Sequence, residues 1–266
     1  MRSPFFVFAM KSSAGKWLKA AVSLAAGLPG KVVDGPVTVL IPAAGLSSRM
    51  EGTDKLALTL GDAPVLVHTL RAFQRCSAVD EIILITRPEK IRSLVETVRA
   101  YGLRKVSTVT EGGETRLESV ARGFSQISAR KGLVAVHDGA RPFVTPEDIE
   151  KVIRAARKYG AATAAVPATD TLKKCDKNGR ILETVPRDGI WRMQTPQVFS
   201  YDLLRVALAY AEASGVQVTD DCGLMEACGI PVYVCPCGIH NIKITATEDL
   251  PVANALTEFQ KTKGNE

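Results

Sequence analysis

The sequence contains few histidine and aromatic residues and no long hydrophobic run. Three of its 266 residues are histidine and 6% are aromatic. No stretch of 18 or more consecutive apolar residues occurs, so no membrane-spanning helix is expected. The motifs G-x-x-x-x-G-K-[ST], G-x-G-x-x-G, G-x-S-x-G and H-E-x-x-H are also absent. These absences exclude a P-loop, a dinucleotide-binding fingerprint, a serine-hydrolase elbow and a zinc-protease helix.

Positive charge exceeds negative charge only slightly in the body of the chain. The whole sequence has a formal net charge of +6. Residues 1–36 hold five cations against Asp34 alone and so account for +4, which leaves +2 for the remaining residues. This balance gives little reason to expect a nucleic-acid groove, so an anionic substrate would have to be met by local clusters of charge.

Six cysteines raise the question of disulfides or a metal site. A chain of this length does not need disulfides in order to fold. The pair in Cys235-Pro-Cys237 has no second pair at the spacing typical of zinc sites. We therefore expect buried, reduced cysteines and a reducing, cytoplasmic compartment.

Residues 1–36 form a basic extension that we expect to be flexible, with at most weak helical structure. The segment has no acidic residue before Asp34, so a transit peptide for organelle import is an alternative, and so is a true start at Met10. The rest of the chain, residues 37–260, is expected to be a single domain.

Beyond residue 36, short apolar runs alternate with helical patterns. Expected strands are 37–41, 81–86, 105–110, 133–136, 161–166, 232–235 and 241–245. Expected helices are 64–76, 88–101, 115–127, 145–159, 201–214, 220–228 and 248–259. This alternation predicts an α/β fold, a mostly parallel sheet with helices on both faces. Asn178-Gly179 between two short runs predicts a β-hairpin over 171–185, which interrupts the alternation and should project as an arm at about 170–187.

Ligands of such sheets bind beyond the carboxyl ends of the strands, so the loops there are the candidate site. The loop at 42–49 is rich in small residues, which lets main-chain N–H groups approach a phosphate or a base. Two glycines at 112–113 precede a capping-box pattern and are expected to expose N–H donors. A plain turn is the alternative for the loop at 42–49, where we favour nucleotide binding, and a plain helix start explains the loop at 112–113 equally simply.

Six cations lie in or near these loops, a set suited to a polyphosphate and a second phosphate. They are Arg49, Lys55, Arg116, Arg141, Arg187 and Lys243. Lys243 lies between isoleucines, which is costly unless its amine reaches solvent or an anion; we favour the anion. The three scattered histidines supply no obvious general base, but a phosphate acceptor would need none, since its second pKa of about 6 leaves it largely dianionic.

Taken in order, these motifs resemble the 2-C-methyl-D-erythritol 4-phosphate cytidylyltransferase family over residues 37 to 260. The matching residues are Pro42-Ala-Ala-Gly45, Arg49, Lys55, Gly112-Gly113-x-x-Arg116-x-x-Ser119, His137-Asp138-x-x-Arg141-Pro142, Asp170-Thr171, Arg187, Gln194-Thr195-Pro196-Gln197, Thr219-Asp220 and Asn241-Ile242-Lys243. Each motif is weak alone, but the ordered set is specific.

The resemblance implies a nucleotidyltransferase-like, Rossmann-like fold and an enzyme that joins CTP and methylerythritol phosphate with Mg²⁺, releasing pyrophosphate. It implies a catalytic group of Arg49, Lys55, Arg187 and Lys243. It implies nucleotide binding by Pro42, Ala43, Ala44, Gly45, Gly113, Glu114, Arg116, Ser119 and Gly139. It implies acceptor binding by Asp138, Arg141, Thr171, Arg187, Thr195 and Thr219. Asp138 is a possible metal ligand, and the arm would exchange between the subunits of a homodimer.

Three departures from the family pattern are Ser47 in place of glycine, Asp54 in place of proline, and Glu114 in place of aspartate. None removes a charge that the chemistry needs. The alternatives are a ribitol 5-phosphate cytidylyltransferase, a sugar-nucleotide pyrophosphorylase with another base, and a non-catalytic nucleotide-binding dimer.

Overall fold

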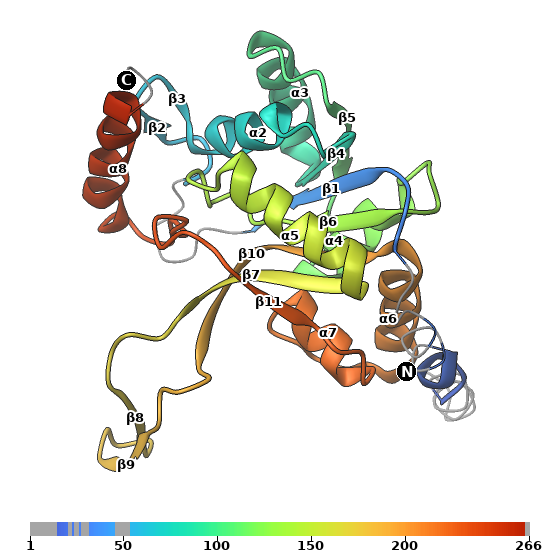
Figure 1. Ribbon diagram of the computed structural model, residues 1–266. Helices are drawn as coiled ribbons and strands as arrows, with labels where there is room; N and C mark the ends of the chain where they lie inside the picture. The colour runs from blue at the N-terminus through green and yellow to red at the C-terminus, as the bar shows by residue number, and fades with distance from the viewer. Residues whose placement is uncertain (1–14, 21–22, 24–26, 28–31, 46–53, 264–266) are drawn as a thin grey trace.

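A seven-stranded sheet forms the centre of the computed structural model, which describes residues 15–20, 23, 27, 32–45 and 54–263 (Figure 1). In spatial order its strands are β11 (Tyr233–Pro236), β7 (Ala161–Pro167), β10 (Trp191–Ser200), β6 (Leu133–Val136), β1 (Val37–Pro42), β4 (Glu81–Thr86) and β5 (Val106–Glu111). All the pairings are parallel except those of β10 with β6 and β7. The predicted fold class is confirmed.

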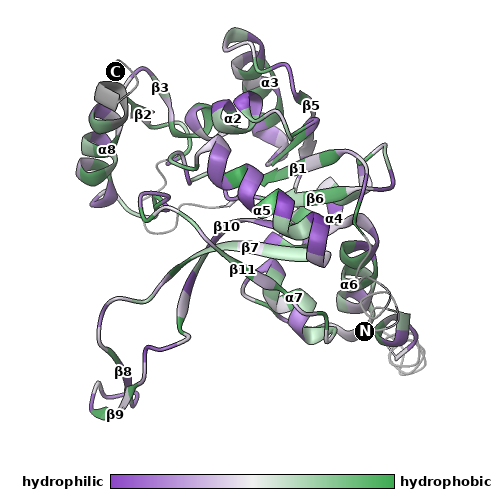
Figure 2. Cartoon of the chain, in the orientation of Figure 1, coloured by the Kyte–Doolittle hydropathy of each residue, from purple (hydrophilic) through white to green (hydrophobic). Residues whose placement is uncertain are grey.

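Helices cover both faces of this sheet. They are α2 (Val65–Arg75), α3 (Ile91–Ala100), α4 (Arg116–Ser125), α5 (Pro146–Tyr159), α6 (Tyr201–Ser214) and α7 (Asp221–Ala227). One core cluster joins the sheet to α2, α3 and α5, and a second joins it to α4, α6 and α7. Helix α8 (Asp249–Lys263) instead packs beside strand β2 (Thr59–Leu60), in a third core cluster (Figure 1). Figure 2 shows hydrophobic colouring along β1 and β6 and mixed colouring on α5, as expected for a buried sheet under amphipathic helices.

Local signals set the ends of α5 as predicted. Thr145 Oγ1 accepts a hydrogen bond from the N–H of Asp148 at 3.2 Å, and Pro146 occupies the first helical position. Gly160 ends the helix in the left-handed conformation.

Strand β10 is the strand of the central sheet that the sequence analysis does not predict. Its residues from Gln194 to Ser200 are all buried, although two glutamines and a proline interrupt any apolar run. The register of β10 against β7 shifts between Met193 and Gln197, the interval that contains Pro196. A proline in a central strand is tolerated at such an irregularity, so sequence patterning gives no strand signal here.

The predicted strand at 241–245 is wrong. The segment has no ladder partner, although the N–H of Ile244 donates to the carbonyl of Ala140 at 2.9 Å. Asn241 and Ile244 are fully buried while Lys243 is exposed, so the alternation comes from a loop that packs across the sheet edge.

The predicted hairpin is confirmed as β8 (Leu172–Cys175) and β9 (Ile181–Val185), which project from the body (Figure 1). Asp176 closes its turn by accepting hydrogen bonds from the N–H groups of Asn178 and Arg180. A separate two-stranded hairpin pairs β2 (Thr59–Leu60) with β3 (Ala63–Pro64), and a 3₁₀ turn, η1 (Pro88–Lys90), precedes α3.

The cysteines are free in the structure, and four of the six are buried as expected. Cys237 is half-buried, and Cys175 is exposed because it lies in the projecting arm.

Residues 15–20 of the basic extension are helical, and Trp17, Leu18 and Ala20 pack against the second core cluster. Among the described helices, none combines the length and apolar character needed to cross a membrane.

We predict that Gly132→Ala destabilises the protein by about 3 kcal/mol or more. Gly132 has φ +82°, and an added Cβ would overlap the backbone carbonyl of Pro36. Gly179→Ala is the matched control, since Gly179 has φ +83° but open space around it, and it should cost about 1 kcal/mol. Urea unfolding of both variants measures the difference; equal losses would contradict a steric role for Gly132.

Candidate active site

The candidate site is a cavity of ≈ 320 Å³ at the carboxyl edge of the parallel strands. It lies where β1 and β6 end, beside the start of α4 and the segment that contains Lys243. The residues that line it are Pro42, Ala43, Ala44, Gly45, Lys55, Leu56, Gly113, Glu114, Thr115, Arg116, Ser119, Asp138, Gly139, Ala140 and Lys243. Parallel strands bring these loops to one edge because their carboxyl ends all point the same way.

The glycines at 112–113 serve close packing. An added Cβ on Gly113 would overlap Glu118, and one on Gly112 would lie 2.7 Å from Ser119 Oγ. The N–H of Gly112 donates to the carbonyl of Thr86, and the N–H of Gly113 to Ser119 Oγ at 3.1 Å. The expectation that these two glycines expose N–H donors is therefore wrong; they let the loop approach α4.

The capping box at the start of α4 is formed with one change. Thr115 Oγ1 accepts from the N–H of Glu118 at 3.1 Å, as predicted. Glu118 reaches back to the N–H of Glu114 at 2.9 Å, one residue before the cap. This arrangement fixes the first turn of α4 and with it the backbone of Arg116.

Asp138 is the centre of the charge distribution in the site. Its Oδ2 lies 3.0 Å from Lys243 Nζ and 3.4 Å from Arg141 Nε, and its Oδ1 lies 3.7 Å from Arg116 Nε. Burial raises the pKa of Asp138, but the charges of Lys243, Arg116 and Arg141 outweigh burial and hold that pKa well below its usual range. Asp138 is therefore ionised at neutral pH and brings three cations from three segments together.

Asp221 is a second acid beside the site, and the sequence analysis gives it no role. Its side chain is almost fully buried, and its Oδ2 lies 2.7 Å from Arg116 Nη2. Burial raises the pKa of Asp221 despite the opposing charge of Arg116. Gln197 Oε1 accepts from the N–H groups of Asp221 and Cys222, both at 3.0 Å, and so links β10 to α7.

His137 precedes Asp138 and is fully buried. Burial lowers the pKa of His137 to about 3, so the ring is uncharged at neutral pH. Its edge-to-face contact with Phe73 has the ring centroids 4.7 Å apart.

Twelve residues predicted from the sequence line the cavity: Pro42, Ala43, Ala44, Gly45, Lys55, Gly113, Glu114, Arg116, Ser119, Asp138, Gly139 and Lys243. Leu56, Thr115 and Ala140 line it without having been predicted, although Thr115 was identified as a helix cap. Arg141 and Thr195, which were also predicted, do not line the cavity but contact Asp138, which does. Lys243 meets Asp138 in the structure, where the sequence favoured a bound anion as its partner.

Three predicted residues, Thr171, Arg187 and Thr219, lie away from the cavity, and the structure does not place a fourth. Arg49 is outside the described residues. Thr171 and Arg187 are exposed at the base of the arm, where Arg187 Nη1 donates to the carbonyl of Thr169 at 2.6 Å. Thr219 is exposed beside Asp220, the N-cap of α7.

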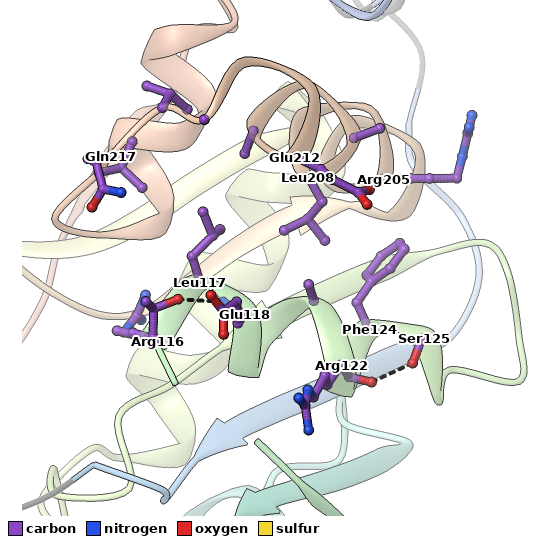
Figure 3. Close-up of a pocket in the computed structure, with 17 residues that line it drawn as sticks. Arg116, Leu117, Glu118, Arg122, Phe124, Ser125, Arg205, Leu208, Glu212 and Gln217 are labelled. Atoms are coloured by element: carbon purple, nitrogen blue, oxygen red, sulfur yellow. Dashed lines mark hydrogen bonds between the residues drawn. The ribbon is translucent and has the colours of Figure 1, made fainter. Parts of the chain in front are cut away.

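A larger cavity of ≈ 850 Å³ lies between α4 and α6 (Figure 3). In Figure 3 Leu117 and Phe124 of α4 face Leu208 of α6 across it. Arg116 lines both cavities, so the start of α4 separates this largely apolar groove from the polar site.

Comparison with known proteins agrees with this geometry. The family model for 2-C-methyl-D-erythritol 4-phosphate cytidylyltransferase matches residues 37–258. The chain belongs to this family. An enzyme of that name from Pelotomaculum thermopropionicum is 43% identical over 228 residues, covering 85% of this chain and 95% of the relative.

Solved structures of cytidylyltransferases show the same fold. The enzyme of Thermus thermophilus matches with a TM-score of 0.69 at 36% identity, covering 84% of this chain and 100% of its own. The 4-diphosphocytidyl-2C-methyl-D-erythritol synthase of Anaerococcus prevotii matches with a TM-score of 0.75 at 32% identity, covering 84% and 96%. This cytidylyltransferase therefore transfers the cytidylyl group of CTP to 2-C-methyl-D-erythritol 4-phosphate, giving 4-diphosphocytidyl-2-C-methyl-D-erythritol and pyrophosphate in isoprenoid synthesis.

We predict that Asp138→Asn lowers the free energy of unfolding of this cytidylyltransferase by about 2 kcal/mol at pH 7, because it leaves the three cations without their shared counter-charge. The folded-state pKa of Asp138 is depressed, so its stabilisation is present above the unfolded-state pKa of about 4 and is lost as the pH falls below it. The difference from wild type should therefore shrink below about pH 4.

Urea unfolding across this pH range measures the effect of Asp138→Asn. Asp202→Asn, on an exposed pair with Arg205 on α6, is the control and should change little. An Asp138→Asn variant as stable as wild type at pH 7 would contradict the role assigned to the carboxylate.

Proposed function

We propose that the smaller cavity is where CTP and methylerythritol phosphate react and that its cations, instead of a general base, perform the catalysis. The observation that supports this is that Lys55, Arg116 and Lys243, far apart in sequence, line one cavity beside the small-residue loop 42–45. The acceptor phosphate is largely dianionic at neutral pH, so its oxygen attacks the α-phosphorus of CTP directly. The new P–O bond forms as the bond to pyrophosphate breaks, and no proton has to be removed.

The proposed roles follow from membership of the family and, for the residues that line the cavity, from their positions as well. Arg49, Lys55 and Lys243 hold the triphosphate and stabilise the charge that develops in the transition state. The loops at 42–45 and 113–119, with Gly139, hold cytosine and ribose. The acceptor is held by Asp138, Arg141, Thr171, Arg187, Thr195 and Thr219. Because Lys243 pairs with Asp138 at 3.0 Å, it is kept beside the cavity until substrate phosphates compete for it.

We also propose that Mg²⁺ accompanies CTP. Asp138 is an ionised carboxylate in the cavity wall, and the described residues contain no cluster of three or more His, Cys, Asp or Glu side chains that could hold a metal. One carboxylate together with substrate phosphates is the usual way in which Mg²⁺ binds. Asp138 and the triphosphate would hold the ion, which would neutralise phosphate charge.

A homodimer formed through the arm is a further proposal. Ile181 and Leu182 of the arm are 60% and 50% exposed, and apolar residues exposed together suit an interface. Thr171 and Arg187 lie at the base of this arm and outside the cavity of their own chain. We infer that they complete the acceptor site of the partner subunit.

We place the enzyme in the cytoplasm, where a reducing environment suits six free cysteines. Import into an organelle is the alternative if the basic extension acts as a transit peptide.

Pyrophosphate release by the purified protein tests the proposed chemistry. We expect turnover with CTP, Mg²⁺ and methylerythritol 4-phosphate, none with ribitol 5-phosphate, and loss of turnover on adding EDTA. Lys243→Ala should lower kcat by about 10²-fold or more without unfolding the protein, because the charge acts on the transition state. Lys131→Ala, which alters an exposed lysine before β6, is the control. Full activity of Lys243→Ala would refute the role of that lysine.

Co-expression of two inactive variants tests the shared site. Arg187→Ala and Lys243→Ala should each be nearly inactive as homodimers. In a mixed dimer, one site receives both defects and the other receives none, so an equal mixture should recover about a quarter of wild-type activity. Activity no higher than that of the separate variants would show that the arm serves its own subunit or that no dimer forms; light scattering distinguishes these two cases.

A further inference from the structure

Both ring nitrogens of His137 take part in hydrogen bonds, which link the loop after β6 to strand β10. Its Nδ1 lies 3.0 Å from Thr195 Oγ1 of β10, and its Nε2 lies 3.3 Å from the carbonyl oxygen of Arg141. The ring is fully buried, and no described carboxylate lies within ion-pair distance of it. His137 does not line the cavity.

These partners fix the direction of the hydrogen bonds. A carbonyl oxygen only accepts, so Nε2 bears the hydrogen and donates to Arg141. In the neutral ring Nδ1 is then an acceptor, and Thr195 Oγ1 donates its hydrogen to it. The same Oγ1 accepts from the N–H of Asp138 at 3.1 Å. One chain of hydrogen bonds thus runs from Asp138 through Thr195 and His137 to Arg141.

A second link closes this arrangement. Arg141 Nη1 donates to the carbonyl of Asn241 at 2.8 Å, and Asn241 Nδ2 donates to the carbonyl of Thr195 at 2.8 Å. Thr195 is therefore held through both its hydroxyl and its carbonyl group. The segment that begins at Asn241 contains Lys243 two residues later. The loop 137–141, strand β10 and this segment are consequently fixed relative to one another.

We propose that His137 is a positioning residue. Through the hydroxyl of Thr195 its single tautomer holds Asp138 in place for the hydroxyl groups of the acceptor, and through its other nitrogen it holds Arg141 for the acceptor phosphate. The inference rests on the proposed roles of Asp138 and Arg141 in acceptor binding. It also gives Thr195 a task besides any contact with substrate. Misplacement of these two groups weakens binding of methylerythritol phosphate more than binding of CTP, because no hydrogen bond in the described part of the chain joins His137 or Thr195 to the loops at 42–45 and 113–119.

Two substitutions of His137 test the roles of the two ring nitrogens separately. His137→Asn places an amide oxygen near Nδ1 and keeps the acceptor for Thr195, whereas His137→Gln places an amide near Nε2 and removes that acceptor. We expect His137→Gln to raise KM for methylerythritol 4-phosphate about tenfold with KM for CTP within about twofold, and His137→Asn to stay within about threefold of wild type for both.

Steady-state kinetics of both variants supply the test, with folding checked by thermal melting. His68→Gln is the control, because His68 bonds the carbonyl of Leu60 away from the cavity and should leave both KM values unchanged. Equal changes in the two KM values, or equal impairment by Asn and Gln, would indicate a merely structural role and overturn the proposal. A wild-type protein inactive with both acceptors would instead refute the proposed function.

Long-range ¹H–¹⁵N spectra of protein labelled in its three histidines give an independent readout. We expect the His137 signals, assigned from their loss in His137→Asn, to show hydrogen on Nε2 and none on Nδ1. Hydrogen on Nδ1 would reverse the bond to Thr195 and overturn the inference. Retention of the expected tautomer in Thr195→Val would also count against it, if KM for the acceptor stayed at the wild-type value.

Discussion

The site depends on one carboxylate that three cations share. Arg116, Arg141 and Lys243 come from α4, from the loop after β6 and from the segment after β11, and their charges would repel one another at this spacing without Asp138. Only 13% of the Asp138 side chain is exposed, so water screens these interactions weakly. A single acid therefore compensates the positive charge that lines this part of the cavity.

The sheet determines which groups can meet at this acid. Parallel β1 and β6 deliver their following loops to one edge, whereas antiparallel β10 passes through the same edge in mid-strand. Two side chains of β10 can thus hold backbone groups of the site in place. Gln197 accepts a hydrogen bond from the start of α7, and Thr195 accepts one from the N–H of Asp138. The polar residues buried in β10 are stable there because each has partners in the neighbouring loops.

Elements that depend on local sequence signals could be predicted, whereas elements that depend on tertiary contacts could not. Strands β1, β4 and β6 are runs of β-branched and apolar residues, and the Thr145-Pro146 pair marks a helix start through contacts within a few residues. Strand β10 escapes prediction because Gln197 gains its partners only in the tertiary structure. Twelve residues that line the cavity could be predicted because they belong to short motifs that occur in the family's order. The pairing of Asp221 with Arg116 could not be predicted, because it joins residues 105 positions apart.

The pairing of Lys243 with Asp138 also bears on the proposed binding of the triphosphate. The Lys243 side chain is 39% exposed and its Nζ bonds Asp138, so an incoming triphosphate meets a cation that already has a partner. Exchange of one anionic partner for another costs less than desolvation of a lone ammonium, because the amine is never left without a counter-charge. Arg116 is less free to exchange, since the buried Asp221 holds it at 2.7 Å from the other side. The two cations therefore differ in their restraints: Arg116 pairs with both Asp138 and Asp221, whereas Lys243 pairs with Asp138. In the proposed reaction Lys243 is for this reason the cation better able to follow the charge from CTP to pyrophosphate.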